Sequence, residues 1–359
     1  MKNKELHIRI LKKVDFSVFC VDSSQKTYYD PTMGVVLPYS SGQQVKKSII
    51  NTLLNELDIE YAPLIFTFAK EGEKLKQKEL IQTCDPSYFD QLIGGWMTAP
   101  DKKNTEKDDD DTLVLSRRSP LSISAMSPVH PLLASVAIEE VITFDRTESN
   151  TESMVVKDGK KILEGDELIK FLEQSNSKLT KRKAAAFKAK RATGLFKIDI
   201  AIDLKKLFRV PTRINDIEIK QSTINKLMES GWKKINIGSG EFLELPKEHH
   251  EEVANAVAES IIRWRITSNQ SRTFDVMSTL TTVVANRADV ISNSVYGELY
   301  NDKNDKNRAK LVIDQSNPNA KFFSNNILKG YLTDVETSAS ANDQAVEYIK
   351  NSILDYYNE

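Results

Sequence analysis

The sequence predicts an α+β fold in which strands and helices alternate along one chain. Three observations lead to this prediction: a long period-two pattern of apolar residues opens the chain, a capped amphipathic helix follows it, and a strand and a helix of the same kinds recur after residue 190. With 359 residues and 40% hydrophobic content, the chain is long enough to bury a full core around such a sheet.

The first predicted strand covers Leu6 to Cys20. Its apolar residues stand at even positions, interrupted only by Lys12, as expected for a strand with one buried face. A helix should start near Gly42, because Ser41 followed three residues later by Gln44 is a capping-box pattern. The apolar face of this helix repeats every four residues, at Val45, Ile49, Leu53 and Leu57.

A region of irregular composition follows the short apolar run Leu64–Ala69. Residues 70 to 131 are rich in Lys, Asp, Ser and Pro, and we expect them to form an insertion. Within it, Glu106–Asp111 contains four consecutive aspartates, which repel one another and predict a mobile loop. This run is a poor candidate metal site, because hard cations need ligands fixed around a cavity.

The second half of the chain resumes regular structure. We expect a strand over Ala134–Phe144, a short helix over Asp166–Glu173, and a basic arm over Lys178–Arg191 that has seven cations and no acid. The strict alternation of Phe196–Leu204 predicts a strand with one wet face. The later predicted elements are a helix over Ile217–Ser230, a hairpin over Lys234–Leu245, a helix from Pro246, a β-rich stretch over Ser271–Arg287 and a terminal helix over Val346–Tyr356.

Strand, helix, strand, and then again strand, helix, strand is the alternation of a ferredoxin-like or RNA-recognition-type sheet with helices on one face. This pattern sets the predicted fold class.

The net charge and the two cysteines limit the classes of function and the cellular setting that the sequence supports. A formal charge of −1 gives no global field toward nucleic acid or membrane, so any polyanion site must come from local clusters. Cys20 and Cys84 have no paired spacing, which favours a reduced, cytoplasmic setting over a disulfide scaffold or a zinc site. No apolar run approaches about 18 residues, so we expect no membrane span.

Common catalytic and cofactor motifs receive no support. None of the four histidines is placed for a nucleophilic triad, and His249 and His250 are adjacent, so they cannot bind one metal as an i, i+4 pair does. Gly238-Ser239-Gly240 lacks the rest of a dinucleotide fingerprint, and no phosphate-binding loop of the Gly-Lys-Ser/Thr type is present. We therefore expect no cofactor. The other two histidines are His7 and His130.

The start of the predicted helix at Gly42 is the first candidate anion site. Lys46 and Lys47 fall in its first turn, where the helix dipole makes each cation unfavourable by roughly 0.3–1 kcal/mol. An anion bound from outside would remove this conflict. The alternative is that both lysines simply point into water.

Other clusters of donors without acids recur along the chain. Groups of this kind hold a nucleic-acid backbone without reading its sequence, and Phe187 and Tyr39 offer rings for stacking on bases. For each single cluster the alternative is a solvated face. The candidate RNA-binding residues are Ser41, Gln43, Gln44, Lys46, Lys47, Arg117, Arg118, Lys181, Arg182, Lys183, Arg191, Arg213 and Arg272.

These residues resemble a known family, the backbone subunit of multi-subunit CRISPR surveillance complexes of the Cascade type, in the RAMP superfamily. The segment Gly42–Ile49 looks like that family's Gly-x-x-x-Lys helix entry. Asn269–Thr273, followed by a β-rich stretch, is similar to its second half. The likeness covers roughly residues 1–70 and 190–300.

The resemblance implies a right-hand shape: an RNA-recognition-type palm, inserted fingers and a thumb hairpin. It implies that copies of the chain stack along one guide RNA, with target DNA or RNA and other CRISPR effector subunits as further partners. Lys46 and Lys47 would contact guide phosphates, and Arg272 would do so less securely. The glycine-rich C-terminal loop of guide-processing relatives is absent from this chain, which disfavours a processing nuclease.

The domain organisation expected on this basis has five parts. They are a first part of the palm over 1–70, an inserted finger region over 71–133, a strand with the basic arm over 134–192, a second part of the palm over 193–300, and a C-terminal extension over 301–359.

Three functions follow as hypotheses. The first is a non-catalytic, oligomerising subunit that coats guide RNA. The second is a metal-dependent endoribonuclease of the same superfamily, in which Asp22 or Asp30 after the first strand cleaves target RNA. The third is a stand-alone RNA-binding protein.

Overall fold

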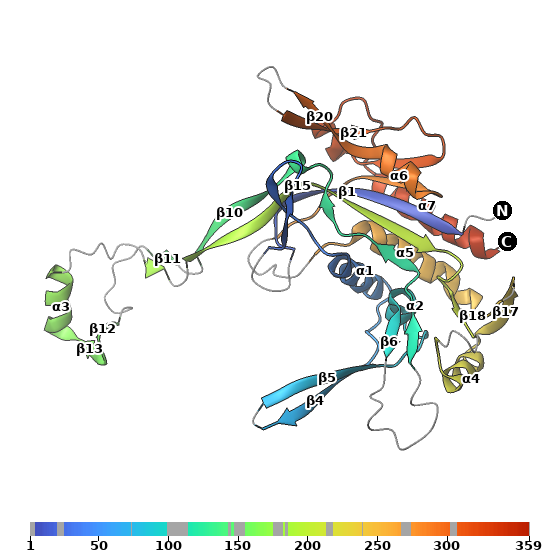
Figure 1. Cartoon of the computed structure of the whole chain (residues 1–359), viewed down its shortest axis with the longest axis horizontal. Coiled ribbons are helices and arrows are strands. Elements are labelled where there is room, and N and C mark those ends of the chain that lie inside the picture. Colours follow the sequence, from blue (N-terminus) through green and yellow to red (C-terminus); the bar gives the residue numbers. More distant parts are fainter. Residues whose placement is uncertain are drawn as a thin grey trace. The chain divides into compact units, whose positions relative to one another are not determined.

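The computed structural model places a seven-stranded sheet at the centre of the chain (Figure 1). Its main path runs in the order β10-β15-β1-β19-β22, and β8 and β9 pair with β15. The described residues are 4–19, 25–72, 74–98, 114–142, 145–146, 155–174, 182–183, 186–212, 218–238, 240–266, 274–301 and 307–358. The sheet strands are β1 (Glu5–Ser17), β8 (Leu121–Ile123), β9 (Ser127–Pro128), β10 (Ala134–Ile142), β15 (Ala186–Asp203), β19 (Thr279–Ala285) and β22 (Ala320–Ser324).

Connectivity within this sheet follows the predicted alternation. Helix α1 (Gly42–Glu56) follows β1, and α5 (His250–Arg263) lies between β15 and β19. Strand β1 pairs with both β15 and β19 in antiparallel register. The four strands β10, β15, β1 and β19 with these two helices thus form a βαββαβ arrangement, which confirms the α+β prediction.

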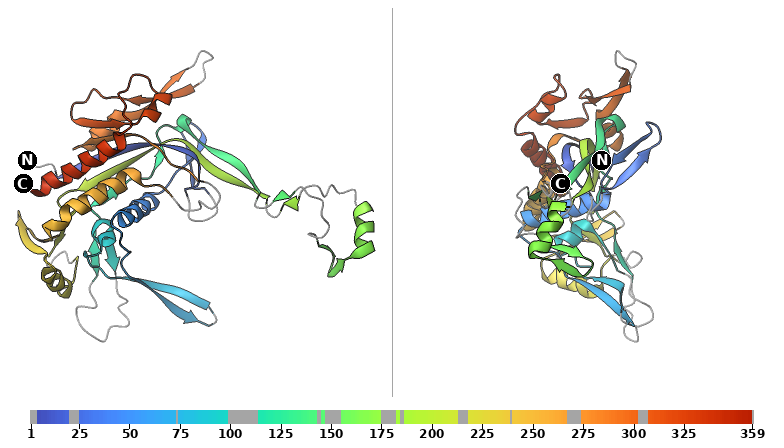
Figure 2. Two further views of the ribbon diagram at one scale, coloured as in Figure 1. Left: turned by 180° about the vertical axis from the view of Figure 1, so that it is seen from behind. Right: turned by 90° about the vertical axis from the view of Figure 1, so that its left-hand side faces the viewer.

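One face of the sheet is buried under helices, as the even-position pattern predicts. Ile8, Ile10 and Ile200 form one core with residues of α1, α5 and α7 (Ala341–Asn358), the helices that Figure 2 shows beside the sheet. The side chains of Ile8 and Ile10 are fully buried, because alternate residues of a strand point to the same face.

The opposite face is partly covered. Along Phe196–Leu204 its residues Lys197, Asp199 and Asp203 remain partly exposed, in line with the expected alternation, and the cover lies elsewhere on this face. A second core contains Leu11, Leu195 and Val283 together with Val290 and Ile291 from α6 (Ala288–Ser294). The hairpin of β20 (Val295–Asn301) and β21 (Asn307–Ile313) adds to this core through Val295 and Leu311. The period-two pattern missed this cover because it comes from the chain's last third.

The predicted insertion over residues 70–131 holds more regular structure than its composition indicates. Described elements there include β5 (Lys74–Gln82), which pairs with the preceding strand β4 (Leu64–Glu71), helix α2 (Phe89–Gly94), and β6 (Trp96–Thr98) paired with β7 (Leu115–Arg117). Strands β8 and β9 of the central sheet also lie in this region. The acidic run Glu106–Asp111 lies outside the described residues.

The predicted helices over Ile217–Ser230 and Val346–Tyr356 are present but differ at their ends. The helix expected from Ile217 begins only at Gln221, as α4 (Gln221–Glu229), and the terminal helix begins five residues earlier than expected. The predicted hairpin around Gly238 is present. The other elements are β2 (Thr27–Asp30), β3 (Val35–Pro38), β11 (Asp145–Arg146), β12 (Val156–Asp158), β13 (Lys161–Leu163), α3 (Gly165–Gln174), β14 (Arg182–Lys183), β16 (Arg209–Pro211), β17 (Lys233–Ile237) and β18 (Gly240–Glu244).

Two compact units make up the chain. The first contains residues 1–136 and 192–359, and the second contains residues 137–191. The second unit holds the outer part of β10, the first residues of β15 and helix α3. No helix among the described residues is long and apolar enough to cross a membrane.

Candidate nucleic-acid interface

The N-terminus of α1 forms as the capping pattern predicts. Ser41 is the N-cap with φ −67° and ψ 148°, and its hydroxyl accepts a hydrogen bond from the Gln44 backbone N–H at 3.4 Å. The Gln44 side-chain oxygen accepts a hydrogen bond from the Ser40 hydroxyl at 3.1 Å. The first turn contains no acidic residue.

Three lysines lie around this helix entry. The Lys46 side chain is half-buried, and desolvation lowers its pKa to about 8. The Lys47 ammonium stands 3.8 Å from the centroid of the Tyr61 ring. Lys26 places its ammonium 3.5 Å from the Ser41 hydroxyl. Lys26 and Tyr61 were missed from the sequence, because only the fold brings Lys26, which precedes β2, to the Ser41 cap and Tyr61, which follows α1, to Lys47.

An anion bound here would meet favourable charge from both the backbone and the side chains. The free N–H groups of a first helical turn carry partial positive charge, and nearby ammonium groups add to it. A partly desolvated ammonium gains more from a phosphate than a fully hydrated one, since its hydration is already partly lost. One acid lies near: the charge of Lys47 acts on Asp90, whose pKa is raised by burial.

Two predicted RNA contacts belong to the protein interior, which corrects the sequence assignment. Arg117 is buried: it donates to the Glu218 carboxylate at 2.8 Å and to the Lys206 carbonyl at 2.8 Å. Arg191 is also buried, and it donates to the Glu139 carboxylate of the neighbouring strand at 2.8 Å. Neither guanidinium faces solvent.

The other predicted contacts divide into exposed residues and residues that the structure does not describe. Gln43 and Arg118 are exposed and accessible to a ligand. Lys181, Arg213 and Arg272 lie outside the described residues. Arg182 and Lys183 form β14, of which the backbone alone is described.

The described part of the basic arm is a strand. Residues from Ala186 onward already belong to β15, so this last part of the arm and the following strand are one element. Along it, the exposed Lys188 and Lys190 alternate with the buried Ala189 and Arg191.

Arg272 lies outside the described residues, but Arg265 and Phe274 on either side of its segment are described. The Arg265 guanidinium lies 5.2 Å from the centroid of the Phe274 ring, and that ring is 64% exposed. An exposed ring beside a guanidinium offers both a stacking surface and a cation for nucleic acid. Neither residue was singled out from the sequence.

Of the two aspartates proposed for the nuclease alternative, only Asp30 is described by the structure. Asp22 lies outside the described residues. The Asp30 carboxylate accepts hydrogen bonds from the Thr32 and Met33 backbone N–H groups at 3.1 and 2.9 Å, which is a turn-forming role. Among the described residues, no group of three or more His, Cys, Asp or Glu side chains is arranged to hold a metal ion.

Comparisons with known proteins find similar structures and no similar sequences. No family model matches the chain, and no curated protein matches it. One similar solved chain comes from a "CRISPR RNA-guided surveillance complex"; it is 10% identical, the match covers 96% of this chain and 99% of that chain, and the TM-score is 0.42. Another comes from a "CRISPR RNA-guided surveillance complex, pre-nicking", at 9% identity, 99% and 90% coverage, and a TM-score of 0.44.

Proposed function

We propose that this chain is a non-catalytic backbone subunit of a CRISPR effector complex. It oligomerises along guide RNA and presents the guide for base pairing with target nucleic acid. The observation that carries the proposal is the N-terminus of α1, where the Lys26 ammonium lies 3.5 Å from the Ser41 hydroxyl, Lys46 and Lys47 follow in the second turn, and the first turn has no acid. Such a site holds a phosphate of any nucleotide, as a guide coat requires.

The second compact unit, residues 137–191, is the candidate for the thumb that the family resemblance implies. It is built on the paired strands β10 and β15, and Lys188 and Lys190 of β15 are exposed on it. We assign to it the contact with RNA or with a neighbouring copy. Arg191 and Glu139 would then serve to hold the two strands together.

The phosphate site is tested by changing Lys46 and Lys47 together to Ala. We expect weaker binding of single-stranded RNA by a similar factor for every sequence, and a salt dependence reduced by roughly 0.7 per lost phosphate contact. The measurement is RNA affinity as a function of salt concentration. The matched control changes two exposed lysines of β22 and its following turn, Lys321 and Lys329, to Ala. An unchanged salt slope in the Lys46/Lys47 variant would contradict the proposal.

A second test separates the scaffold from the endoribonuclease alternative. We expect the complex assembled on guide RNA to leave complementary RNA intact in the presence of Mg²⁺ or Mn²⁺, because Asp30 already accepts two backbone hydrogen bonds in its turn. The measurement is gel analysis of labelled target RNA, with Asp22→Ala and Asp30→Ala variants in parallel. Cleavage at regular intervals that either variant abolishes would replace the scaffold proposal by the nuclease.

A further inference from the structure

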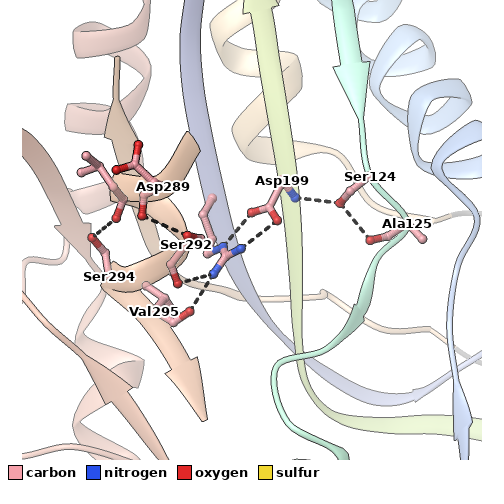
Figure 3. Close-up of polar contacts among 9 residues, drawn as sticks. Ser124, Ala125, Asp199, Asp289, Ser292, Ser294 and Val295 are labelled. Atoms are coloured by element: carbon pink, nitrogen blue, oxygen red, sulfur yellow. Dashed lines mark hydrogen bonds and ion pairs between the residues drawn. The ribbon is translucent and has the colours of Figure 1, made fainter. Parts of the chain in front are cut away.

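A polar network on the sheet face opposite α1 reaches the helix entry through one short loop. Arg9 of β1 and Asp199 of β15 are direct partners in the antiparallel register. The Arg9 guanidinium donates to both Asp199 oxygens, at 2.6 and 2.8 Å, and to the carbonyls of Ser292 and Val295, each at 2.9 Å (Figure 3). Four of its five N–H donors are therefore used inside the protein.

The backbone of Asp199 also forms two hydrogen bonds with Ser124. The Asp199 N–H donates to the Ser124 hydroxyl at 2.9 Å, and the Ser124 N–H donates to the Asp199 carbonyl at 2.9 Å. Ser124 lies between β8 and β9, where the pairing with β15 shifts by one residue from Ile123–Ile200 to Ser127–Lys197. The serine thus fixes a bulge in the edge of the sheet, and bulges re-aim the residues around them.

This bulge is the surface on which the first turn of α1 rests. A Cβ atom added to Gly42 would lie 2.6 Å from the Ile123 carbonyl oxygen and 3.1 Å from that of Ser124. On the other side of the loop, Ser40 and Met126 exchange two backbone hydrogen bonds of 3.0 Å. The residues immediately before and after the Ser41 cap are therefore both set by the 123–126 backbone.

We infer that Ser124 and Asp199 are positioning residues for the α1 entry, which they orient through the bulge and Gly42. The inference rests on the proposed phosphate site and adds the part of the molecule that sets its geometry. The network itself is not the ligand site, because the hydrogen-bonding groups of Arg9 and Asp199 are directed at each other and at the backbone. It borders a cavity of about 520 Å³.

The test compares Ser124→Ala with Ser124→Thr, which keeps the hydroxyl. We expect Ser124→Ala to raise hydrogen exchange at the backbone amides of residues 42–46 in the RNA-free protein and to weaken RNA binding about tenfold, because the Asp199 N–H loses its acceptor. Ser124→Thr should restore both. The control is Asp289→Asn, since Asp289 lines the same cavity and its carboxylate pairs with Arg287.

Combining Ser124→Ala with the Lys46/Lys47 double change distinguishes positioning from general damage. If the serine acts through the helix entry, the triple variant should bind RNA no more weakly than the lysine variant alone. Additive losses, or unchanged exchange at residues 42–46 in Ser124→Ala, would overturn the inference. Failure of the phosphate site itself would appear separately, as an unchanged salt slope in the lysine variant.

Discussion

Replacing Lys12 by Met is expected to remove a rise in the free energy of unfolding between pH 7 and 10.5. Lys12 is 2% exposed, and burial lowers its pKa from 10.5 to about 7, partly opposed by the charge of Asp275. Its ammonium donates to the Trp264 and Met277 carbonyls, each at 3.3 Å, and to the Thr279 hydroxyl at 3.1 Å.

The sign follows from proton binding. Between about pH 7 and 10.5 the unfolded chain keeps the Lys12 proton and the folded chain releases it, so raising the pH favours the folded state. The expected slope is on the order of 1.4 kcal/mol per pH unit over this window. Below pH 7 both states carry the proton and the slope vanishes.

The measurement is urea unfolding of the wild-type and Lys12→Met proteins at pH 7, 8, 9 and 10. The difference between their unfolding free energies should change across this range, because only the wild-type chain contains the buried amine. Lys13→Met is the control: Lys13 is only partly buried, and its pKa is raised by a hydrogen bond to Asp15. If the unfolding free energies of wild type and Lys12→Met changed with pH in parallel, the lowered pKa of Lys12 would be contradicted.

The elements that could be predicted from the sequence are those whose signal is local. Alternation predicted the even-numbered face of β1 correctly as far as Val14, but Phe16, which has φ 56° where the register shifts, is 54% exposed. Ser41 with Gln44 located the start of α1 to the residue. Lys12, which interrupts that alternation, is explained by three oxygens that come from beyond residue 260. A pattern read within one strand contains no information about those acceptors.

The candidate site was only partly predictable for the same reason. Lys46 and Lys47 were identified because a cation close to a helix N-terminus is a local anomaly. The expected first-turn position was wrong: α1 begins at Gly42, so the two lysines are its fifth and sixth residues and lie in the second turn. Tyr61, Lys26 and the bulge at Ser124 depend on which strands become neighbours. Where a cluster is judged by charge alone, a buried ion pair and a phosphate contact look identical.

Arg117 and Arg118 are adjacent in sequence, and comparing them tests whether an arginine forms a buried ion pair or contacts phosphate. The Arg117 side chain has no exposed surface, and its partner Glu218 is 8% exposed. The guanidinium also donates to the Leu92 carbonyl at 3.2 Å and lies 5.5 Å from the Trp96 ring centroid. Arg118, its neighbour in sequence, is exposed.

Arg117→Met is therefore expected to lower the free energy of unfolding by about 3–5 kcal/mol, because Glu218 would be left as a buried charge without its main partner. Arg118→Met should change stability by less than about 0.5 kcal/mol. Chemical denaturation measures both. In the double variant Arg117→Met/Glu218→Gln, the loss of stability should be smaller than in Arg117→Met alone, since the unpaired buried charge is gone.

The two arginine variants should also differ in RNA binding when they are compared at equal folded fraction. Arg118→Met should weaken RNA binding and reduce its salt dependence if Arg118 contacts phosphate, whereas Arg117→Met should leave the salt dependence unchanged. A small loss of stability in Arg117→Met, together with a reduced salt dependence of RNA binding, would contradict the interior position of Arg117 and support its original assignment as an RNA contact.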